Sequence, residues 1–215
     1  MKIFMFILLT GFVAFLYPQT DKDKSHDNDM DMKIKGNVQL PAGWEMRFDK
    51  TDANKNDMEL IKENDFYHFT TGPAAIYYDP KDEESGEFKI ESGFIQIKPS
   101  KHPEAYGIFL AGSDLQKENQ HYLYFLVWQD GKYLIKERSG NGTKEIVKWT
   151  ADKNVNSQKK NCQTINKLSV TVGKNNIIFS ANGKKVKTLD KSNLGNGNGI
   201  VGFRNNHNLD VKQVN

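Results

Sequence analysis

From Val38 onward, short apolar runs alternate with turn residues along the chain. The runs are rich in β-branched and aromatic residues, and Gly, Asn and Asp cluster between them, which is typical of β-strands joined by tight turns. The strands that this pattern predicts lie within residues 86–98, 105–111, 122–128, 132–138, 145–149, 168–172, 177–181, 184–189, 200–204 and 208–214. Only residues 57–64 favour a short helix. About a dozen short strands with regular turns predict an all-β, antiparallel two-sheet sandwich of the jelly-roll type.

Two glycine positions carry more specific expectations. Gly107 interrupts an apolar strand, which predicts that a neighbouring backbone approaches closely there. In residues 86–98, Ile90 and Ile95 fall on opposite sides of an ideal strand, with the pair Ser92-Gly93 between them. Either a β-bulge at this pair switches the face, or the strand is covered on both sides.

The stretch YLYFLVWQDGKYLIKER, residues 122–138, predicts a hairpin around Asp130-Gly131. Asp-Gly is a preferred pair for a two-residue type I′ turn. Such a turn would place Trp128 opposite Tyr133. The same register would place Leu126 opposite Ile135 and Tyr124 opposite Glu137.

The first strand of this hairpin is apolar on both sides, whereas a half-exposed strand alternates apolar with polar residues. If one side faces the core through Leu123, Phe125, Val127 and Leu134, the other side forms one patch that contains Tyr124, Trp128, Tyr133 and Glu137. Aromatic rings on a concave sheet face can stack on sugar rings. The alternative is that the aromatic row is itself core, or is covered by a loop or the N-terminal segment. Tyrosine hydroxyls and a carboxylate fit poorly in a dry core, so we expect water to reach this side.

A second polar group lies in FRNNHNLDVK, residues 203–212. On an extended chain, four side chains would project one way and His207 the other way: Arg204, Asn206, Asn208 and Asp210. This row could line a sugar site. It could equally tie the last strand to a neighbouring loop through hydrogen bonds. Metal binding by His207 is not favoured, because no second His lies nearby in the sequence.

Catalytic carboxylates are not evident from spacing. Glu87 and Glu91 share one face of a strand but lie about 13 Å apart, which is more than the about 5–9.5 Å that glycosidases use. Lys89 lies between them. Glu137 and Asp210 are the pair that an enzyme interpretation would need to bring together.

Metal, cofactor and cysteine chemistry find little support in the sequence. Residues 52–63 match calcium-loop positions one, three, five and twelve, but Asp57 stands where the loop needs Gly. We therefore predict no metal and no cofactor. Cys162 is the only cysteine, so an internal disulfide is excluded and a loop thiol is expected.

The ends and the bulk composition set the expected organisation. The chain has 215 residues, 27% of them charged, and a formal net charge of +3 without a long basic run, which does not favour nucleic-acid binding. Residues 1–20 read as a signal peptide or N-terminal anchor, residues 21–37 as a disordered charged linker, and residues 38–215 as one β-sandwich domain. We expect an exported protein (periplasmic, extracellular or membrane-anchored) that meets a membrane only through the N-terminal segment if that segment is not cleaved.

Four runs resemble a group of largely uncharacterised exported bacterial proteins: FYHFTTGPAAIYYDP (66–80), KHPEAYGIFLAGSDL (101–115), YLYFLVWQDGKYLIKERSG (122–140) and GIVGFRNNHNLDVK (199–212). The fold of that group is similar to the concanavalin A-like lectin/glucanase sandwich, near the LamG-like and 3-keto-disaccharide hydrolase-like domains. The resemblance implies that fold and glycan binding or, in some members, hydrolysis. It supplies no catalytic residues. The polar positions that match are Asp114, Arg204, Asn206, His207, Asn208 and Asp210.

Together these observations favour a lectin-like carbohydrate-binding module with a possible glycan or oligosaccharide partner. The alternatives are a glycoside hydrolase-like enzyme and a non-catalytic cell-envelope module that binds other proteins. The predicted ligand-binding residues are Tyr124, Trp128, Tyr133, Glu137, Arg204, Asn206, Asn208 and Asp210. No catalytic residue is predicted.

Overall fold

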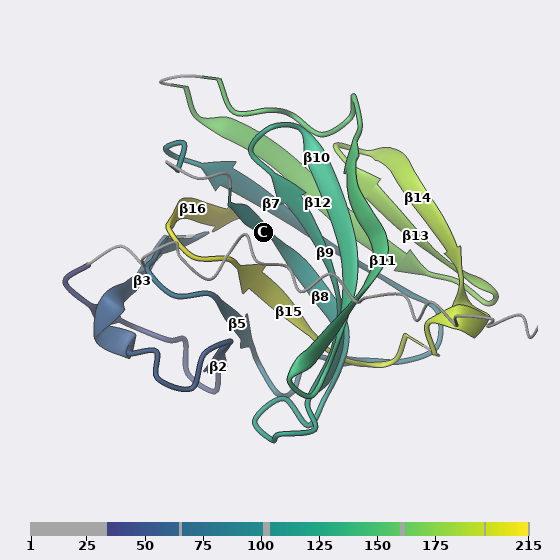
Figure 1. Cartoon of the computed structure of the whole chain (residues 1–215), viewed down its shortest axis with the longest axis horizontal. Helices are drawn as coiled ribbons and strands as arrows, with labels where there is room; N and C mark the ends of the chain where they lie inside the picture. Colours follow the sequence, from purple (N-terminus) through teal and green to yellow (C-terminus); the bar gives the residue numbers. More distant parts are fainter. Residues whose placement is uncertain (1–33, 65, 101–103, 160–161, 196, 215) are drawn as a thin grey trace, which may run out of the picture. The chain divides into compact units, whose positions relative to one another are not determined.

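The computed structural model describes residues 34–214 except 65, 101–103, 160–161 and 196. The N-terminal segment 1–20 and most of the linker 21–37 lie outside the described residues. Two large sheets make up the described part (Figure 1). Sheet A has the order β1-β3-β4-β16-β7-β12-β13-β14, and sheet B has the order β11-β10-β9-β8-β15-β5-β2, with β6 paired to β15.

The strands of sheet A are β1 (Asn37–Val38), β3 (Met58–Glu63), β4 (Phe66–Thr71), β7 (Phe88–Gln96), β12 (Thr164–Val172), β13 (Asn176–Ala181), β14 (Lys184–Asp190) and β16 (Leu209–Val214). The strands of sheet B are β2 (Glu45–Phe48), β5 (Ala75–Tyr78), β6 (Glu83–Glu84), β8 (Ala105–Ser113), β9 (His121–Trp128), β10 (Lys132–Ser139), β11 (Gly142–Ala151) and β15 (Gly199–Asn205). Among the described pairs, β1 and β3 run parallel, and the others are antiparallel. The predicted all-β, two-sheet jelly-roll sandwich is confirmed.

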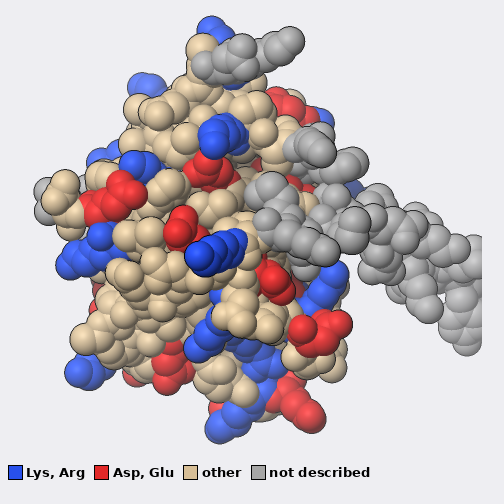
Figure 2. Space-filling view, turned by 90° about the vertical axis from the view of Figure 1, so that its left-hand side faces the viewer, with Lys and Arg blue, Asp and Glu red and all other residues tan. Residues whose placement is uncertain are grey.

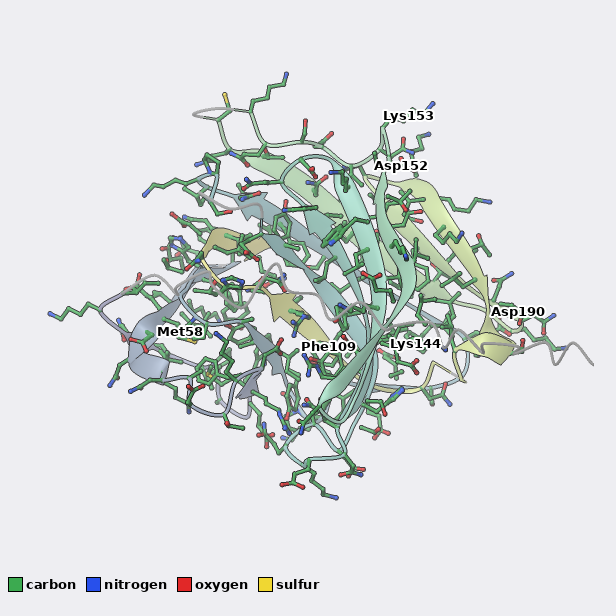
Figure 3. The ribbon with its side chains drawn as sticks, viewed as in Figure 1. Met58, Phe109, Lys144, Asp152, Lys153 and Asp190 are labelled. Carbon is green, nitrogen blue, oxygen red and sulfur yellow. The ribbon has the colours of Figure 1, made fainter. Side chains whose placement is uncertain are left out.

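The helix predicted over residues 57–64 is wrong. A single 3-10 turn, η1 (Lys55–Asp57), is capped by the Asn54 side chain, and β3 follows at once. Met58 and Leu60 are completely buried, while Glu59 between them is partly exposed. This two-residue period belongs to a strand with one face in the core, and Figure 3 labels Met58 where β3 begins. In the described ranges, no helix is long and apolar enough to cross a bilayer.

The main core lies between the sheets, and side chains fill the space between the ribbons (Figure 3). Sheet B contributes alternate residues of its long strands, including Ile108, Phe125 and Ile135, and sheet A contributes residues such as Phe69 and Phe179. Phe125 packs edge-on against Phe179 with ring centroids 5.4 Å apart. These contacts join the two sheets through the centre of the sandwich.

The two glycine expectations have different outcomes. A Cβ atom at Gly107 would lie 2.1 Å from the carbonyl oxygen of Phe125, so the predicted close approach of the neighbouring strand is confirmed. The β7–β12 pairing runs from Phe88 to Gln96 without a register shift. The bulge considered at Ser92-Gly93 is therefore absent.

Candidate functional site

The turn between β9 and β10 is one residue longer than predicted. Trp128 lies opposite Lys132, so the loop has three residues, Gln129 to Gly131, instead of two. The Gly131 amide donates to the Trp128 carbonyl at 3.0 Å, and Gly131 has a φ of +83°, which glycine adopts without strain. A glycine at the last position of a three-residue hairpin loop is a common alternative to the two-residue turn.

This single-residue difference places every β10 side chain on the face of sheet B opposite to the one predicted. Tyr133 lies in the main core, where its hydroxyl donates to the Val186 carbonyl at 3.1 Å. Glu137 lies opposite Leu123 and contacts His121 at 2.9 Å. Leu134, predicted to face the core, lies in the outer cluster of sheet B. The predicted common patch of Tyr124, Trp128, Tyr133 and Glu137 is therefore wrong.

Water does not reach the middle of the aromatic side of β9. Tyr122 and Leu126 are 1% exposed and Tyr124 is 3% exposed. These side chains belong to a second apolar cluster on the outer side of sheet B, which includes Phe109. The guanidinium of Arg204 lies 4.8 Å from the centre of the Tyr124 ring, and burial raises the pKa of Tyr124 to about 12. The expectation of an open aromatic row is thus wrong for the centre of β9.

A charged cluster joins three distant parts of the chain next to this row. Arg204 in β15 donates from Nη1 to Asp49 Oδ1 at 2.8 Å and from Nη2 to Oδ2 at 2.6 Å. Arg138 near the end of β10 donates from Nη2 to Asp49 Oδ2 at 3.1 Å. Arg204 also donates to the Tyr122 hydroxyl at 3.1 Å. Asp49 comes directly after β2, so two guanidinium groups share one carboxylate.

The electrostatic state of Asp49 follows from these partners. Burial alone would raise its pKa, but the charge and hydrogen bonds of Arg204, with smaller effects of Arg138 and Arg47, lower it to about 2. Arg47 in β2 donates to the backbone carbonyls of Leu115 and Lys117 at 2.8 and 2.6 Å. Three guanidinium groups therefore act on one carboxylate that stays ionised at neutral pH.

Two tryptophan residues form an aromatic platform at the other end of this face. The rings of Trp128 in β9 and Trp149 in β11 lie 4.7 Å apart between centroids, and both residues are half-buried. Lys132 Nζ lies 4.9 Å from the centre of the Trp128 ring and 2.6 Å from Asp130. Both residues are therefore more accessible than the centre of β9, although Lys132 lies over the Trp128 ring.

The accessible part of the face follows β10. Lys132, Lys136 and Arg138 lie opposite Trp128, Tyr124 and Tyr122, so they share the outer side. We call these three cations, with Trp128 and Trp149 at one end and Asp49 at the other, the β10 strip. Six strand residues separate its ends, about 20 Å. In Figure 1 the bent strands β9, β10 and β11 run side by side through this region.

Three N–H donors on this face are buried without an acceptor in the described part of the chain: Trp128 Nε1, Arg138 Nε and Arg204 Nε. Buried donors usually have a hydrogen-bond partner, and leaving one without a partner costs about 1–3 kcal/mol. Because these three atoms are closed off from solvent, a buried water is the ordinary acceptor for them.

The predicted polar row of residues 204–210 does not form a common surface. The chain passes from sheet B to sheet A between Asn205 and Leu209, and Asn208 has a φ of +57°. The Thr71 hydroxyl donates to the Asn206 carbonyl at 2.8 Å and accepts from the Leu209 amide at 3.1 Å. These bonds tie the last strand to β4 through the Thr71 side chain. Of the row itself, Arg204 makes hydrogen bonds to Asp49 in the loop after β2, which is the alternative that the sequence left open.

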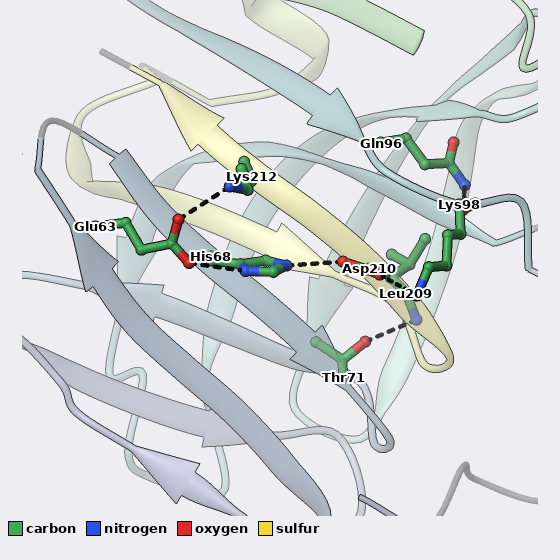
Figure 4. Close-up of polar contacts among 8 residues, drawn as sticks. All are labelled: Glu63, His68, Thr71, Gln96, Lys98, Leu209, Asp210 and Lys212. Atoms are coloured by element: carbon green, nitrogen blue, oxygen red, sulfur yellow. Dashed lines mark hydrogen bonds and ion pairs between the residues drawn. The ribbon is translucent and has the colours of Figure 1, made fainter. Parts of the chain in front are cut away.

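Asp210 lies in a separate cluster on sheet A (Figure 4). His68 in β4 contacts Asp210 through Nε2 at 2.7 Å and Glu63 through Nδ1 at 3.2 Å. Lys212 donates to Glu63 at 2.9 Å, and Lys98 lies 3.7 Å from Asp210. The hydrogen bond to Asp210 raises the pKa of His68, burial opposes this, and the bond to Glu63 adds to it.

The carboxylate pair that an enzyme would need is not assembled. Glu137 lies in sheet B with His121 as its partner, and Asp210 lies in sheet A with His68 as its partner. Among the described residues, no group of three or more His, Cys, Asp or Glu side chains is placed to hold a metal. The calcium-like spacing of residues 52–63 does not form a loop, because Glu63 ends β3. Cys162 is an exposed free thiol, as predicted.

A cleft of about 330 Å³ opens between the sheets at another place. Trp44, Tyr67 and Phe203 line it, and Asp79 and Asp82 also contribute to its wall. Trp44 packs against Tyr67 at 5.2 Å and Phe203 at 5.8 Å. Nearby, on the face of the molecule that includes β3, charges of both signs are interspersed (Figure 2).

The sequence prediction included Trp128 but missed the five other members of the β10 strip, which are Asp49, Lys132, Lys136, Arg138 and Trp149. Trp149 ended a predicted strand, so its pairing with Trp128 could have been examined once the strand order was known. Arg138 lay at the end of the quoted hairpin, but the two-residue turn placed it on the wrong face. Asp49 stands in FDKTD without a distinguishing signal.

The strand order and the two sheets define a concanavalin A-like jelly-roll fold. Among solved structures, the carbohydrate-binding module CBM66 from Bacillus subtilis matches with a TM-score of 0.56 and 12% identity over 80% of this chain and 92% of that one. A glycoside hydrolase family 16 endo-glucanase from Bacteroides ovatus matches with a TM-score of 0.52 and 12% identity over 85% of this chain and 86% of that one.

The exoplasmic domain of VIP36, in a Ca²⁺- and Man3GlcNAc-bound form, matches with a TM-score of 0.51 and 8% identity over 80% of this chain and 81% of that one. No protein-family model and no curated protein matches the sequence. At these identities the likeness establishes the fold.

Proposed function

We propose that the protein is an exported, non-catalytic carbohydrate-binding module whose ligand lies along the β10 strip. The observation that carries this function is the half-buried pair of Trp128 and Trp149 on the outer side of sheet B. The two indole planes are inclined at 42°, and a partly exposed aromatic ring can stack on the apolar face of a sugar ring while the sugar hydroxyl groups stay available to polar side chains.

The polar groups of the strip complement the platform. Lys132 and Lys136 stand beside the aromatic surface and are partly exposed. The indole N–H of Trp128 has no acceptor in the described part of the chain. That N–H is buried, so the lysine ammonium groups are the donors that sugar hydroxyls can reach, and donors beside an aromatic wall give a small-molecule site its orientation. The fold is compatible, because one of its structural neighbours is a carbohydrate-binding module.

Binding without hydrolysis fits the carboxylate at the strip better than catalysis does. A glycosidase needs a carboxylic acid that is protonated near neutral pH and a second carboxylate at a fixed distance. Asp49 has a pKa lowered to about 2, and the charge of Arg204 is the main cause that overcomes burial. Both oxygens of Asp49 also accept hydrogen bonds from arginine. Asp49 is therefore suited to holding the guanidinium groups in place.

Substitution of Trp128 by Ala tests the function. We expect oligosaccharide affinity to fall at least about fivefold, since an aromatic stacking contact contributes about 1 kcal/mol or more. Isothermal titration calorimetry against a panel of neutral and acidic oligosaccharides measures the change. Phe66→Ala is the matched control, because Phe66 in β4 also lies under a lysine, Lys212, at 4.3 Å, but on sheet A.

The Phe66→Ala variant should bind as the wild type does. A protein that binds no saccharide of the panel, or equal affinity of wild type and Trp128→Ala, refutes the function. Export rests on the pattern of residues 2–20 alone. It is refuted if the protein stays in the cytoplasmic fraction when its own host is fractionated.

A further inference from the structure

The β10 strip has more positive than negative groups at its Asp49 end. Arg138 and Arg204 both donate to Asp49, and Arg47 is close enough to lower the Asp49 pKa as well. Lys136 continues the positive side chains along β10, with Glu145 opposite it on β11. Buried and half-buried charges are normally balanced by partners, and Asp49 balances one of the three guanidinium charges.

Arg138 has N–H donors that are not bound to Asp49. A guanidinium carries five N–H donors in a planar fork. Nη2 of Arg138 reaches Asp49 at 3.1 Å, while Nε is buried without an acceptor in the described part of the chain. Arg204 repeats this arrangement, with Nη1 and Nη2 on Asp49 and Nε unused. Both Nε atoms are buried, so an incoming anion would balance the surplus charge without reaching these two donors.

The charged cluster of Arg204, Arg138 and Asp49 is partly exposed to solvent. Side-chain exposure rises from 6% at Arg204 to 11% at Arg138 and 24% at Asp49. Arg204 is thus the buried support, and Arg138 is the more exposed of the two arginines that donate to Asp49. A second carboxylate at Arg138 would lie beside Asp49, so the surplus positive charge of the cluster must outweigh the repulsion between the two carboxylates.

We propose that the ligand of the β10 strip is an acidic saccharide, with a uronate carboxylate bound by Arg138 and a sugar ring stacked on Trp128 and Trp149. This assignment rests on the proposed function and names its ligand class. A carboxylate accepts strong, charge-assisted hydrogen bonds from a guanidinium group. Lys136 lies between the two ends on the same face, where it adds charge attraction. The ends lie about 20 Å apart, so an oligosaccharide is needed to reach both.

The experiment compares oligouronates with their uncharged methyl esters. Hexamers of galacturonic, glucuronic and mannuronic acid, each also fully methyl-esterified, are titrated by calorimetry into the full chain. At least one acid should bind at least about tenfold more tightly than its ester, the usual gain from a hydrogen bond to a charged group. The affinity of that acid should fall as NaCl is raised, because salt screens the attraction.

Arg138→Gln should lower the affinity for that acid at least about tenfold and leave the ester unchanged. Lys144→Gln is the matched control. It removes the same charge from the neighbouring strand β11, where Figure 3 shows Lys144, at a position opposite Glu137 on the other face. This control should change affinity less than about twofold. If Arg138→Gln loses its native circular dichroism, Lys136→Gln takes its place with an expected loss of about threefold.

The outcomes separate the ligand class from the function. Equal binding of acid and ester, binding of neutral saccharides alone, or equal effects of Arg138→Gln and Lys144→Gln overturns the acidic ligand but leaves carbohydrate binding standing. If Lys136→Gln is used, an effect equal to that of Lys144→Gln has the same meaning. Absence of binding to every acidic, esterified and neutral oligosaccharide overturns both.

Discussion

Replacement of Asp49 by Asn tests the energetic role of the charged cluster. The side chain keeps its shape, but Arg204 loses its negative partner while it stays 6% exposed. Removing one partner of a buried ion pair typically costs about 3–5 kcal/mol, because the remaining charge is not compensated. The hydrogen bonds from Arg204 at 2.6 and 2.8 Å place this pair in that class. We expect a loss of about 3 kcal/mol of unfolding free energy at pH 7.

The pH dependence follows from the pKa of the same carboxyl group. Arg204 overcomes the effect of burial and lowers the Asp49 pKa from 3.8 to about 2, which corresponds to about 2.5 kcal/mol. A lowered pKa means that the native state favours the ionised form. The stabilisation is therefore complete above pH 4 and is lost as the pH falls from about 4 through about 2.

Urea unfolding followed by circular dichroism at pH 7, 5, 3.5 and 2.5 measures both effects. The difference between wild type and Asp49→Asn should be largest at pH 7 and 5 and shrink at the two lower values. Asp130→Asn is the control, because Asp130 and Lys132 form an exposed pair, with side chains 39% and 37% accessible. Such pairs contribute about 0–1 kcal/mol. A loss below 1 kcal/mol for Asp49→Asn, or a difference independent of pH, refutes the reasoning.

Two further predictions concern the folded framework. The hydrogen bond to Asp210 raises the pKa of His68 from 6.5 against the effect of burial. The stability that the charged His68 contributes is therefore complete below pH 6.5 and is lost as the pH rises through the folded pKa. In thermal unfolding, the stability difference between wild type and His68→Gln should shrink between pH 6 and 9, and a constant difference contradicts this prediction. A methyl group in Gly107→Ala would meet the Phe125 carbonyl oxygen at 2.1 Å. We expect Gly107→Ala to lower the free energy of unfolding in urea by about 3 kcal/mol. The control Gly142→Ala should lower it by less than about 1 kcal/mol, because the nearest atom to its added Cβ lies 3.5 Å away. Equal losses would show that the strands at Gly107 move apart at little cost.

The hairpin of β9 and β10 shows how far local pattern can be read. The two strands and the turn between them were evident from their apolar runs and from Asp130-Gly131. Both two-residue and three-residue loops are compatible with that dipeptide, and the choice depends on which β10 residues fit the core. Tyr133 fits there because its hydroxyl finds the Val186 carbonyl on the opposite sheet, a partner that lies 53 residues away.

The burial of β9 also depends on a residue that is distant in the sequence. The sequence showed that both sides of the strand are apolar, and the structure buries both sides from Tyr122 to Val127. Polar tips on an aromatic row were expected to need water. Instead, Arg204 donates to the Tyr122 hydroxyl and covers the Tyr124 ring, so a buried charge takes the place of solvent.

The sequence by itself determined the strands from β7 onward and the two-layer architecture, because these depend on a two-residue alternation and on turn residues only a few positions apart. It did not place β1 to β6, and β3 lies where a helix was expected. Only the tertiary structure decided the site. Asp49 and Arg204 lie 155 residues apart, and His68 and Asp210 lie 142 apart. Whether such groups meet depends on strand order and register. Every pair of strands adds its own register, and a shift of one residue exchanges the two faces of a sheet.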